Sequence, residues 1–202
     1  MEEIILQEEI SQLMNKKGEV RGIALINESD FIIKEKGKEG LKKFEEAVAR
    51  LGVTRGQKEL NKWEFYPIWQ EIIGLLVIKK TFNFSDEKMK EIGILGSKLS
   101  YIIKLFFQYY MGSMNSLAQK APEMWRKYYT IGDLVVEEIN EEKKYIIVDI
   151  KNFNFHPIHC LHLSGYFSNI VKLASDTKTI IDCQEIKCVH RGDEYHQFLI
   201  KW

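Results

Sequence analysis

The sequence feature that most constrains the fold is a change of pattern at Gly132. Before this glycine, apolar residues recur every three or four positions, as they do in amphipathic helices. After it, the runs "DLVVEEI" and "KKYIIVDI" are rich in β-branched residues and are joined by the polar "NEEK", which is typical of a β-hairpin. The chain therefore has to combine a helical N-terminal part with a sheet built by its C-terminal part.

The remaining C-terminal segments complete this sheet. The segment "HPIHCLHLSGYFSNIVKLAS" has a helical pattern with Pro157 near its start. The segments "KTIIDCQEIKC" and "EYHQFLIKW" then predict a second hairpin around Arg191, Gly192 and Asp193. The order strand, strand, helix, strand, strand predicts an α+β fold in which the helical N-terminal part packs on a four-stranded antiparallel sheet.

Helical spacing predicts several helices before Gly132. The expected helices cover residues 2–15, 38–52, 67–80 and 86–111, followed by a shorter helix that stops and restarts at Pro122. Gly37 marks a turn before the second helix, and Pro67 is expected at the first position of the third. We interpret residues 1–20 as a helical extension, which either lies on its own domain or pairs with the same helix of a second subunit. Residues 21–202 are expected to form one ligand-binding domain.

Composition and charge exclude some partners. Lys plus Arg and Asp plus Glu both number 29, so no net charge attracts the chain to nucleic acid or to an anionic membrane. The apolar run Ile72–Ile78 is too short to cross a bilayer, so membrane insertion is not expected. Three cysteines, an odd number, do not make a disulfide framework, and the N-terminal stretch lacks a signal-peptide pattern. These features predict a reducing, cytoplasmic location.

The residues most able to bind a metal ion lie close together in the sequence. All five histidines and all three cysteines fall between His156 and His196. If the second hairpin turns at Gly192, Cys188 and His196 stand opposite each other with Cβ atoms about 5 Å apart. His196 shares its strand face with the apolar Phe198, so its buried imidazole needs a partner.

Zinc prefers four ligands from cysteine, histidine and carboxylate side chains. Cys160 on the preceding helix and Glu185 complete the set, although Glu185 reaches the site only if a β-bulge turns it inward. Cys183 is a poorer candidate. The alternative is that the thiols are ordinary core residues. The other histidines have structural interpretations: His156 as a helix cap, His159 and His162 as a polar stripe, and His190 as a solvated turn residue.

Four segments, taken in order, resemble one superfamily. They are "GIALINESDFIIKEKGKEGLKKFEEAVARLG", "WEFYP", "APEMWRKYYTIGDL" and "CVHRGDEYHQFLIKW". Together they are similar to the superfamily of heme-NO-binding domains, 4-vinyl-reductase-like domains and TRAPP transport subunits. That resemblance implies the same helical N-terminal part and β-β-α-β-β C-terminal part. The 4-vinyl-reductase-like branch implies a structural zinc site with a Glu-x2-Cys-x7-Cys pattern, in which His196 here replaces the last cysteine.

The resemblance also bears on heme and on an apolar pocket. The heme branch carries an axial histidine in its middle region and a Tyr-x-Ser-x-Arg motif, but residues 86–129 contain neither, so heme is disfavoured. A pocket between the helices and the sheet is implied. The residues expected to line it are Trp63, Tyr66, Phe106, Tyr110, Trp125 and Tyr128. The alternative is that these aromatics only fill the core.

We therefore predict a sensory domain that binds a small apolar or aromatic ligand, contains structural zinc and works as a homodimer. The alternative function is a scaffold or dimerisation module like the transport-complex subunits. An enzyme is not expected, because the sequence shows no Ser/His/Asp order, phosphate loop or paired-carboxylate motif.

Overall fold

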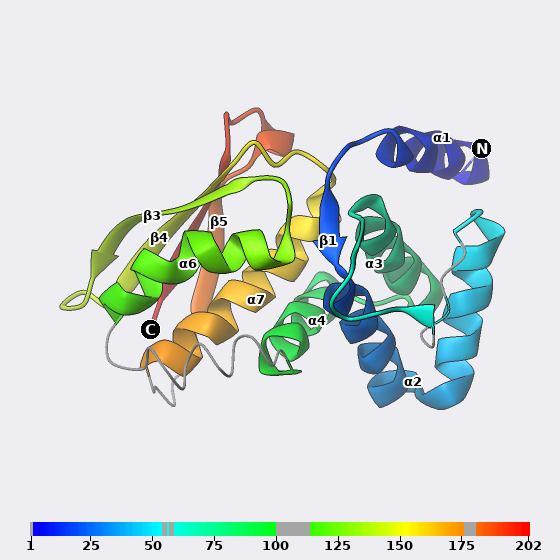
Figure 1. Cartoon of the computed structure of the whole chain (residues 1–202), viewed down its shortest axis with the longest axis horizontal. Helices are drawn as coiled ribbons and strands as arrows, with labels where there is room; N and C mark the ends of the chain where they lie inside the picture. The colour runs from blue at the N-terminus through cyan, green and yellow to red at the C-terminus, as the bar shows by residue number, and fades with distance from the viewer. Residues whose placement is uncertain (1, 54–55, 57–58, 100–113, 176–180) are drawn as a thin grey trace. The chain divides into compact units, whose positions relative to one another are not determined.

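A computed structural model of the chain describes residues 2–53, 56, 59–99, 114–175 and 181–202 (Figure 1). It divides into two compact units, Met1–Ser85 and Asp86–Trp202. The α+β fold class is confirmed: the described α-helices lie mainly in the N-terminal part, and a four-stranded antiparallel sheet occupies the C-terminal part. None of the helices in the described part of the chain is long and apolar enough to cross a membrane.

The first unit is mainly helical. It contains α1 (Glu2–Met14), β1 (Glu19–Arg21), α2 (Gly22–Arg50), β2 (Phe65–Pro67) and α3 (Trp69–Phe82). Helices α2 and α3 pack against each other and carry buried apolar residues such as Phe31, Phe44 and Ile72. The predicted turn lies inside α2, where Gly37 has φ 68° and ψ −168° and interrupts the helical backbone. Glycine tolerates this left-handed φ because it has no Cβ.

The strands β1 and β2 form a short antiparallel ladder that the sequence analysis missed. Val20 pairs with Tyr66 and Glu19 pairs with Pro67. Pro67 therefore ends a strand and does not begin α3, which starts at Trp69. The end of a short strand tolerates a residue without an N–H, and the ladder continues from the N–H of Ile68 to the carbonyl of Gly18 at 3.0 Å.

The second unit contains the sheet and its covering helices. Its elements are α4 (Asp86–Leu99), α6 (Met114–Tyr128), β3 (Asp133–Asn140), β4 (Tyr145–Lys151), α7 (Pro157–Ser175), β5 (Asp182–Lys187), the short 3₁₀ helix η2 (Val189–Arg191) and β6 (His196–Lys201). The sheet order is β3-β4-β6-β5, with every neighbouring pair antiparallel. This arrangement confirms the predicted β-β-α-β-β order.

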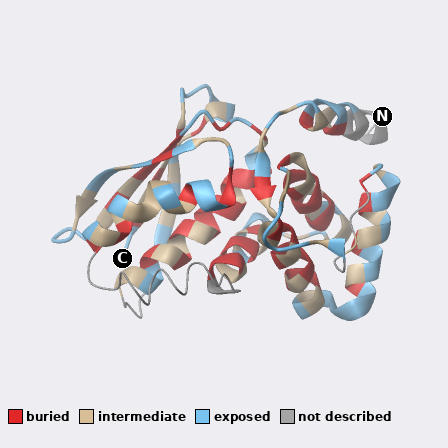
Figure 2. Ribbon diagram, viewed as in Figure 1, coloured by how far each residue is buried: buried red, intermediate tan, exposed pale blue. Residues whose placement is uncertain are grey.

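One face of the sheet forms the core of the second unit. Ile146, Val148 and Ile150 of β4 pair with Ile200, Phe198 and His196 of β6, and all six residues are buried. Buried stretches, red in Figure 2, also run along α7. Helix α7 contacts β5 and β6, while α6 contacts β3 and α7 (Figure 1). His196 thus shares the buried face with Phe198 and Ile200, as the strand alternation predicted.

Helix α6 differs from the prediction. It runs without a break from Met114 to Tyr128 with Pro122 in its interior, so the expected stop and restart is wrong. Proline removes one helical hydrogen bond. Burial of Met114, Leu117, Trp125 and Tyr128 along one side supplies tertiary packing that keeps the helix continuous. Of the predicted helix 86–111, α4 accounts for Asp86–Leu99, and the remaining residues lie outside the described part of the chain.

Helices α4 and α7 approach so closely that their backbones touch at two glycines. A Cβ atom on Gly165 would lie 1.9 Å from the carbonyl oxygen of Lys90, and one on Gly93 would lie 2.0 Å from that of His162. Nearby, the amide of Asn169 donates a buried 2.8 Å hydrogen bond to the hydroxyl of Ser97. The position of α7 is therefore set by direct backbone contact with α4.

Replacing Gly165 by alanine should test this contact. Alanine stabilises an unconstrained helix by about 1 kcal/mol relative to glycine. Here the methyl group meets a main-chain oxygen, so we expect Gly165→Ala to lower the free energy of unfolding by about 1–3 kcal/mol. Denaturant unfolding followed by circular dichroism measures the change, with Leu173→Ala at an exposed position of α7 as control. A gain in stability would contradict the close approach.

Candidate metal centre

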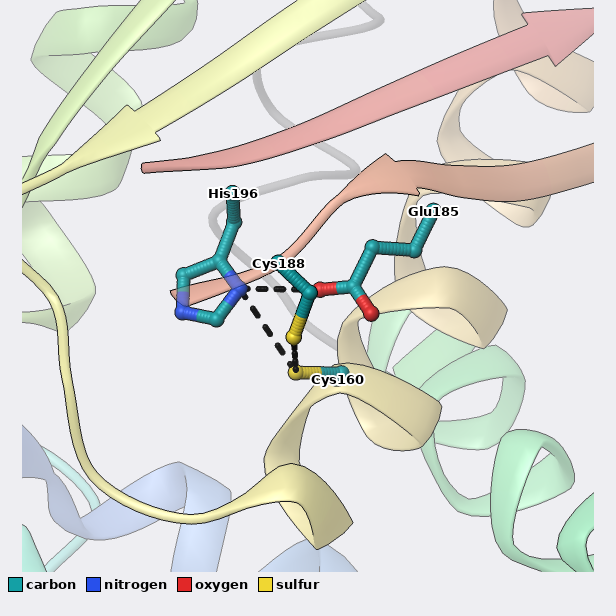
Figure 3. A group of neighbouring side chains, drawn as sticks. All are labelled: Cys160, Glu185, Cys188 and His196. Carbon is teal, nitrogen blue, oxygen red and sulfur yellow. Dashed lines mark hydrogen bonds and ion pairs between the residues drawn. The ribbon is translucent and has the colours of Figure 1, made fainter. Parts of the chain in front are cut away.

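Four side chains from separate elements of the second unit meet at one point (Figure 3). They are Cys160 on α7, Glu185 on β5, Cys188 just after β5, and His196 at the start of β6. One ligand atom from each lies within 4.8 Å of all the others. The structure thus brings together the four residues that the sequence analysis selected, and three of them are buried.

A β-bulge turns Glu185 toward the other three residues. Glu185 pairs with Phe198, but the next pair joins Lys187 to Gln197, so Ile186 is the extra residue. The Ile186 side chain is 44% exposed, while Glu185 points to the covered side. The condition that the sequence analysis set for Glu185 is therefore met. Cys183 is on the same face but pairs with Ile200, farther along the ladder, and does not join the group.

The turn after β5 holds Cys188 by its backbone. The Cys188 N–H donates to Asp193 Oδ2 at 2.8 Å, and its carbonyl accepts from the N–H groups of Arg191 and Asp193 at 2.8 and 3.2 Å. Gly192 closes the turn with φ 96°, a left-handed conformation that favours glycine. The predicted Arg-Gly-Asp turn is present, and its hydrogen bonds hold the Cys188 backbone in place.

His196 is oriented by a main-chain carbonyl. Its Nε2 lies 2.8 Å from the carbonyl oxygen of Phe153, which can only accept, so Nε2 carries a proton. Its Nδ1 lies 2.8 Å from Glu185 Oε1 and 3.7 Å from Cys160 Sγ. In a neutral imidazole this Nδ1 has no proton, so two lone pairs would face each other. A second proton or a metal ion must lie between them.

The two thiols of the group are buried and close together. Their sulfur atoms are 3.9 Å apart. Burial, and then the nearby Glu185 carboxylate, raises the pKa of Cys160 far above its usual range, and burial likewise raises the pKa of Cys188. Without a metal ion both residues are therefore thiols at neutral pH. A metal ion that binds here must displace these protons, because the thiolate is the ligand.

The pKa of Glu185 shifts in the opposite direction to the pKa values of the two cysteines. Burial alone would raise its pKa, but hydrogen bonds from His196, Cys160 and Cys188 outweigh burial and lower the pKa below the ordinary value of 4.5. A carboxyl whose pKa is lower in the folded state stabilises the fold above its unfolded pKa. It loses that contribution as the pH falls through the folded pKa.

We therefore expect Glu185→Gln to destabilise the metal-free protein most at neutral pH. Its difference from wild type should shrink as the pH falls below the ordinary carboxyl value of 4.5. Urea unfolding at a series of pH values, with a chelator present, measures this difference. Glu194→Gln, at an exposed position of the same turn, is the control. A difference that does not change with pH would contradict the argument.

The remaining histidines have structural contacts. His156 caps α7 as predicted, because its Nδ1 accepts from the N–H of Ile158 at 2.9 Å. His190 is exposed, also as predicted. His159 and His162 are buried instead of forming a polar stripe, with stacked rings 5.6 Å apart, and His159 Nε2 lies 3.3 Å from the Tyr129 hydroxyl.

The residues predicted to line a ligand pocket fall into three groups. Trp63 and Tyr66 belong to the first unit, where Trp63 is 48% exposed and the Tyr66 hydroxyl accepts from the N–H of Asn61 at 2.9 Å. Trp125 and Tyr128 are buried in the second unit. Phe106 and Tyr110 lie outside the described residues. The pocket therefore stays a prediction.

Three contributors to the candidate centre were not found from the sequence. Phe153 acts through its carbonyl, Asp193 through a turn hydrogen bond, and Arg191 through contacts with Glu185. A main-chain carbonyl has no residue signature. The composition of the turn was noted from the sequence, but polar turn residues are common on any surface.

Comparison with known proteins identifies the fold. No family model matches the chain, and no curated protein matches it. Among solved structures, an H-NOX protein from S. oneidensis in the Fe(II)NO state has a TM-score of 0.65 and 12% identity, with 90% of this chain and 98% of that chain covered. An unliganded Fe(II) H-NOX mutant from K. algicida has a TM-score of 0.62 and 16% identity, with 90% and 95% covered. The chain has the fold of H-NOX domains.

The shared fold raises the question of heme. The first histidine of the chain is His156, and all five histidines lie in the last quarter of the sequence. The middle region, residues 86–129, therefore has no axial histidine to offer. The four donors that do converge are two sulfurs, a nitrogen and a carboxylate, which is a zinc-type set.

Proposed function

We propose that this chain is a non-enzymatic sensory domain in which a structural zinc ion ties helix α7 to the β5–β6 hairpin. The observation that carries the zinc site is the convergence of Cys160, Glu185, Cys188 and His196, whose ligand atoms all lie within 4.8 Å of one another. Four protein ligands fill a tetrahedral zinc site and leave no open position for catalysis.

The distances within the group suit a tetrahedral ion. Two thiolates at about 2.3 Å from such an ion stand about 3.8 Å apart, and the two sulfurs are 3.9 Å apart. A thiolate and an imidazole nitrogen would stand about 3.5 Å apart, and Cys160 Sγ and His196 Nδ1 are separated by 3.7 Å. Glu185 Oε1 and His196 Nδ1, now 2.8 Å apart, would have to separate by roughly 0.6 Å.

The ion would also resolve the electrostatics of the buried group. It would bind the lone pair of His196 Nδ1 and a lone pair of the Glu185 carboxylate, which without an ion need a proton between them. It would convert the two thiols to thiolates and so join three chain segments that are distant in sequence. Since these ligands come from α7 and from both sides of the hairpin, zinc would stabilise the second unit.

Metal content is the direct test. Protein purified without a histidine tag or added metal should contain about one zinc per chain, and a double variant with Cys188→Ser and His196→Ala should contain none. The double variant should melt roughly 5–10 °C lower, because zinc at 100 times its dissociation constant stabilises the folded state by about 2.7 kcal/mol. Cys183→Ser is the matched control, because this cysteine lies outside the group. Metal-free wild-type protein would contradict the proposal.

The sensory part of the proposal is supported by the fold. The matched structures are H-NOX proteins, and several of them are described with iron ligation states. We propose that this chain uses the same fold to bind a small apolar or aromatic molecule in place of heme, and that it signals as a homodimer. Zinc would stiffen the C-terminal unit against which such a ligand acts.

Ligand binding can be tested with a panel of phenol, indole and naphthalene. A ligand that binds only the folded state at 100 times its dissociation constant stabilises the protein by about 2.7 kcal/mol. For a chain of this size we expect a saturable rise in melting temperature of roughly 5–10 °C. The zinc-free double variant, whose melt is begun at a lower temperature because it is less stable, is the control for effects of the compounds on zinc binding. No saturable shift with any of the three compounds would contradict this part of the proposal.

A further inference from the structure

Arg191 makes two contacts with one residue of the candidate centre. It ends the 3₁₀ turn η2, three residues after Cys188. Its Nη1 lies 3.2 Å from Glu185 Oε2, and its Nη2 donates to the main-chain carbonyl of Glu185 at 2.9 Å. A single guanidinium thus holds both the backbone and the carboxylate of Glu185, which the planar fork of arginine can do and a point charge cannot.

These contacts decide which way the carboxylate points. With Oε2 on Arg191, the other oxygen, Oε1, is directed at His196 Nδ1. The Glu185 side chain is 12% exposed and that of His196 is 3% exposed, so Glu185 stands on the solvent side of the group. His196 and Cys188 are fixed by Phe153 and Asp193, whereas Glu185 is fixed by Arg191.

The positive charge of Arg191 has a second effect on Glu185. Two thiolates and a carboxylate around a divalent ion leave one net negative charge on the group. The Arg191 side chain, 53% exposed, places a positive charge beside it at the solvent edge. A charge-assisted hydrogen bond at this point stabilises Glu185 in its ionised form, the form that binds a metal ion.

We propose that Arg191 is a positioning residue of the metal site, which holds Glu185 as a carboxylate ligand with one oxygen toward the ion. This inference rests on the proposed zinc site and adds a residue to it. Residues that orient metal ligands typically change metal affinity by about 10–100-fold when they are replaced. Both contacts that Arg191 makes with the group are to Glu185, so its effect on the metal depends on Glu185.

A double-mutant cycle tests this dependence. Zinc affinity is measured by competition with a chromophoric chelator for wild type, Arg191→Met, Glu185→Gln and the double variant. Arg191→Met should weaken zinc binding about 10-fold or more, and Glu185→Gln at least as much. The double variant should bind zinc as Glu185→Gln alone does, because the carboxylate that Arg191 holds is already gone.

Two further variants separate positioning from general stability. Arg191→Lys should restore only part of the affinity, since an ammonium cannot make both contacts. Arg126→Met removes another exposed arginine, which lies 3.5 Å from Asp133, and should leave zinc affinity unchanged. With Co²⁺ as the probe ion, the visible spectrum of Arg191→Met should change in the same way as that of Glu185→Gln, which a loss of stability alone would not cause.

The outcomes distinguish the two proposals. If wild type binds zinc but the two single effects add in the double variant, Arg191 acts on the hairpin and the inference is overturned while the zinc site stands. The inference is also overturned if Arg191→Met or Glu185→Gln binds zinc as tightly as wild type does. If wild type binds neither zinc nor Co²⁺, the metal site and this inference fail together.

Discussion

The C-terminal unit depends on how a buried histidine is held. The Phe153 carbonyl accepts a hydrogen bond from the N–H at His196 Nε2, and this leaves Nδ1 facing a carboxylate and a thiol in the interior. Buried lone pairs that face one another cost free energy unless a proton or a cation lies between them. Side chains reach this point from three directions: a bulge in β5, a tight turn after Cys188, and the first turn of α7.

Helix α7 connects this group to the rest of the unit. Cys160 lies near its start, and the same helix meets α4 through Gly165 and the Asn169 hydrogen bond. Because the two backbones touch, α7 has little freedom to slide without moving α4. Any ligand that shifted α4 or α7 would therefore change the position of the Cys160 sulfur. In the part of the chain that the structure describes, the H-NOX fold thus carries a group of four potential metal donors beside the sheet.

Local patterns predicted the parts of the fold that local physics controls. Alternation in β6 predicted that His196 faces inward with Phe198, and Pro157 correctly marked the start of α7. The β1–β2 ladder was missed because each strand has only three residues, too few to show a period. Pro122 was read as a break because the proline penalty is local, whereas the packing that keeps α6 continuous is tertiary. His159 and His162 were predicted to form a polar stripe, but both are buried residues of α7 because this helix packs against the rest of the unit.

The sequence by itself determined the order of the four sheet strands and the helix between them, and the identity of four potential ligands in the last quarter of the chain. Residue type and periodicity act over a few positions, so they can be read from the chain directly. Only the tertiary structure decided that Glu185 turns inward, that Phe153 fixes the protonated nitrogen of His196, and that Arg191 binds Glu185. A bulge exists only relative to a partner strand, and a carbonyl becomes a partner only when a distant segment is brought beside it. These features therefore follow from the folded arrangement.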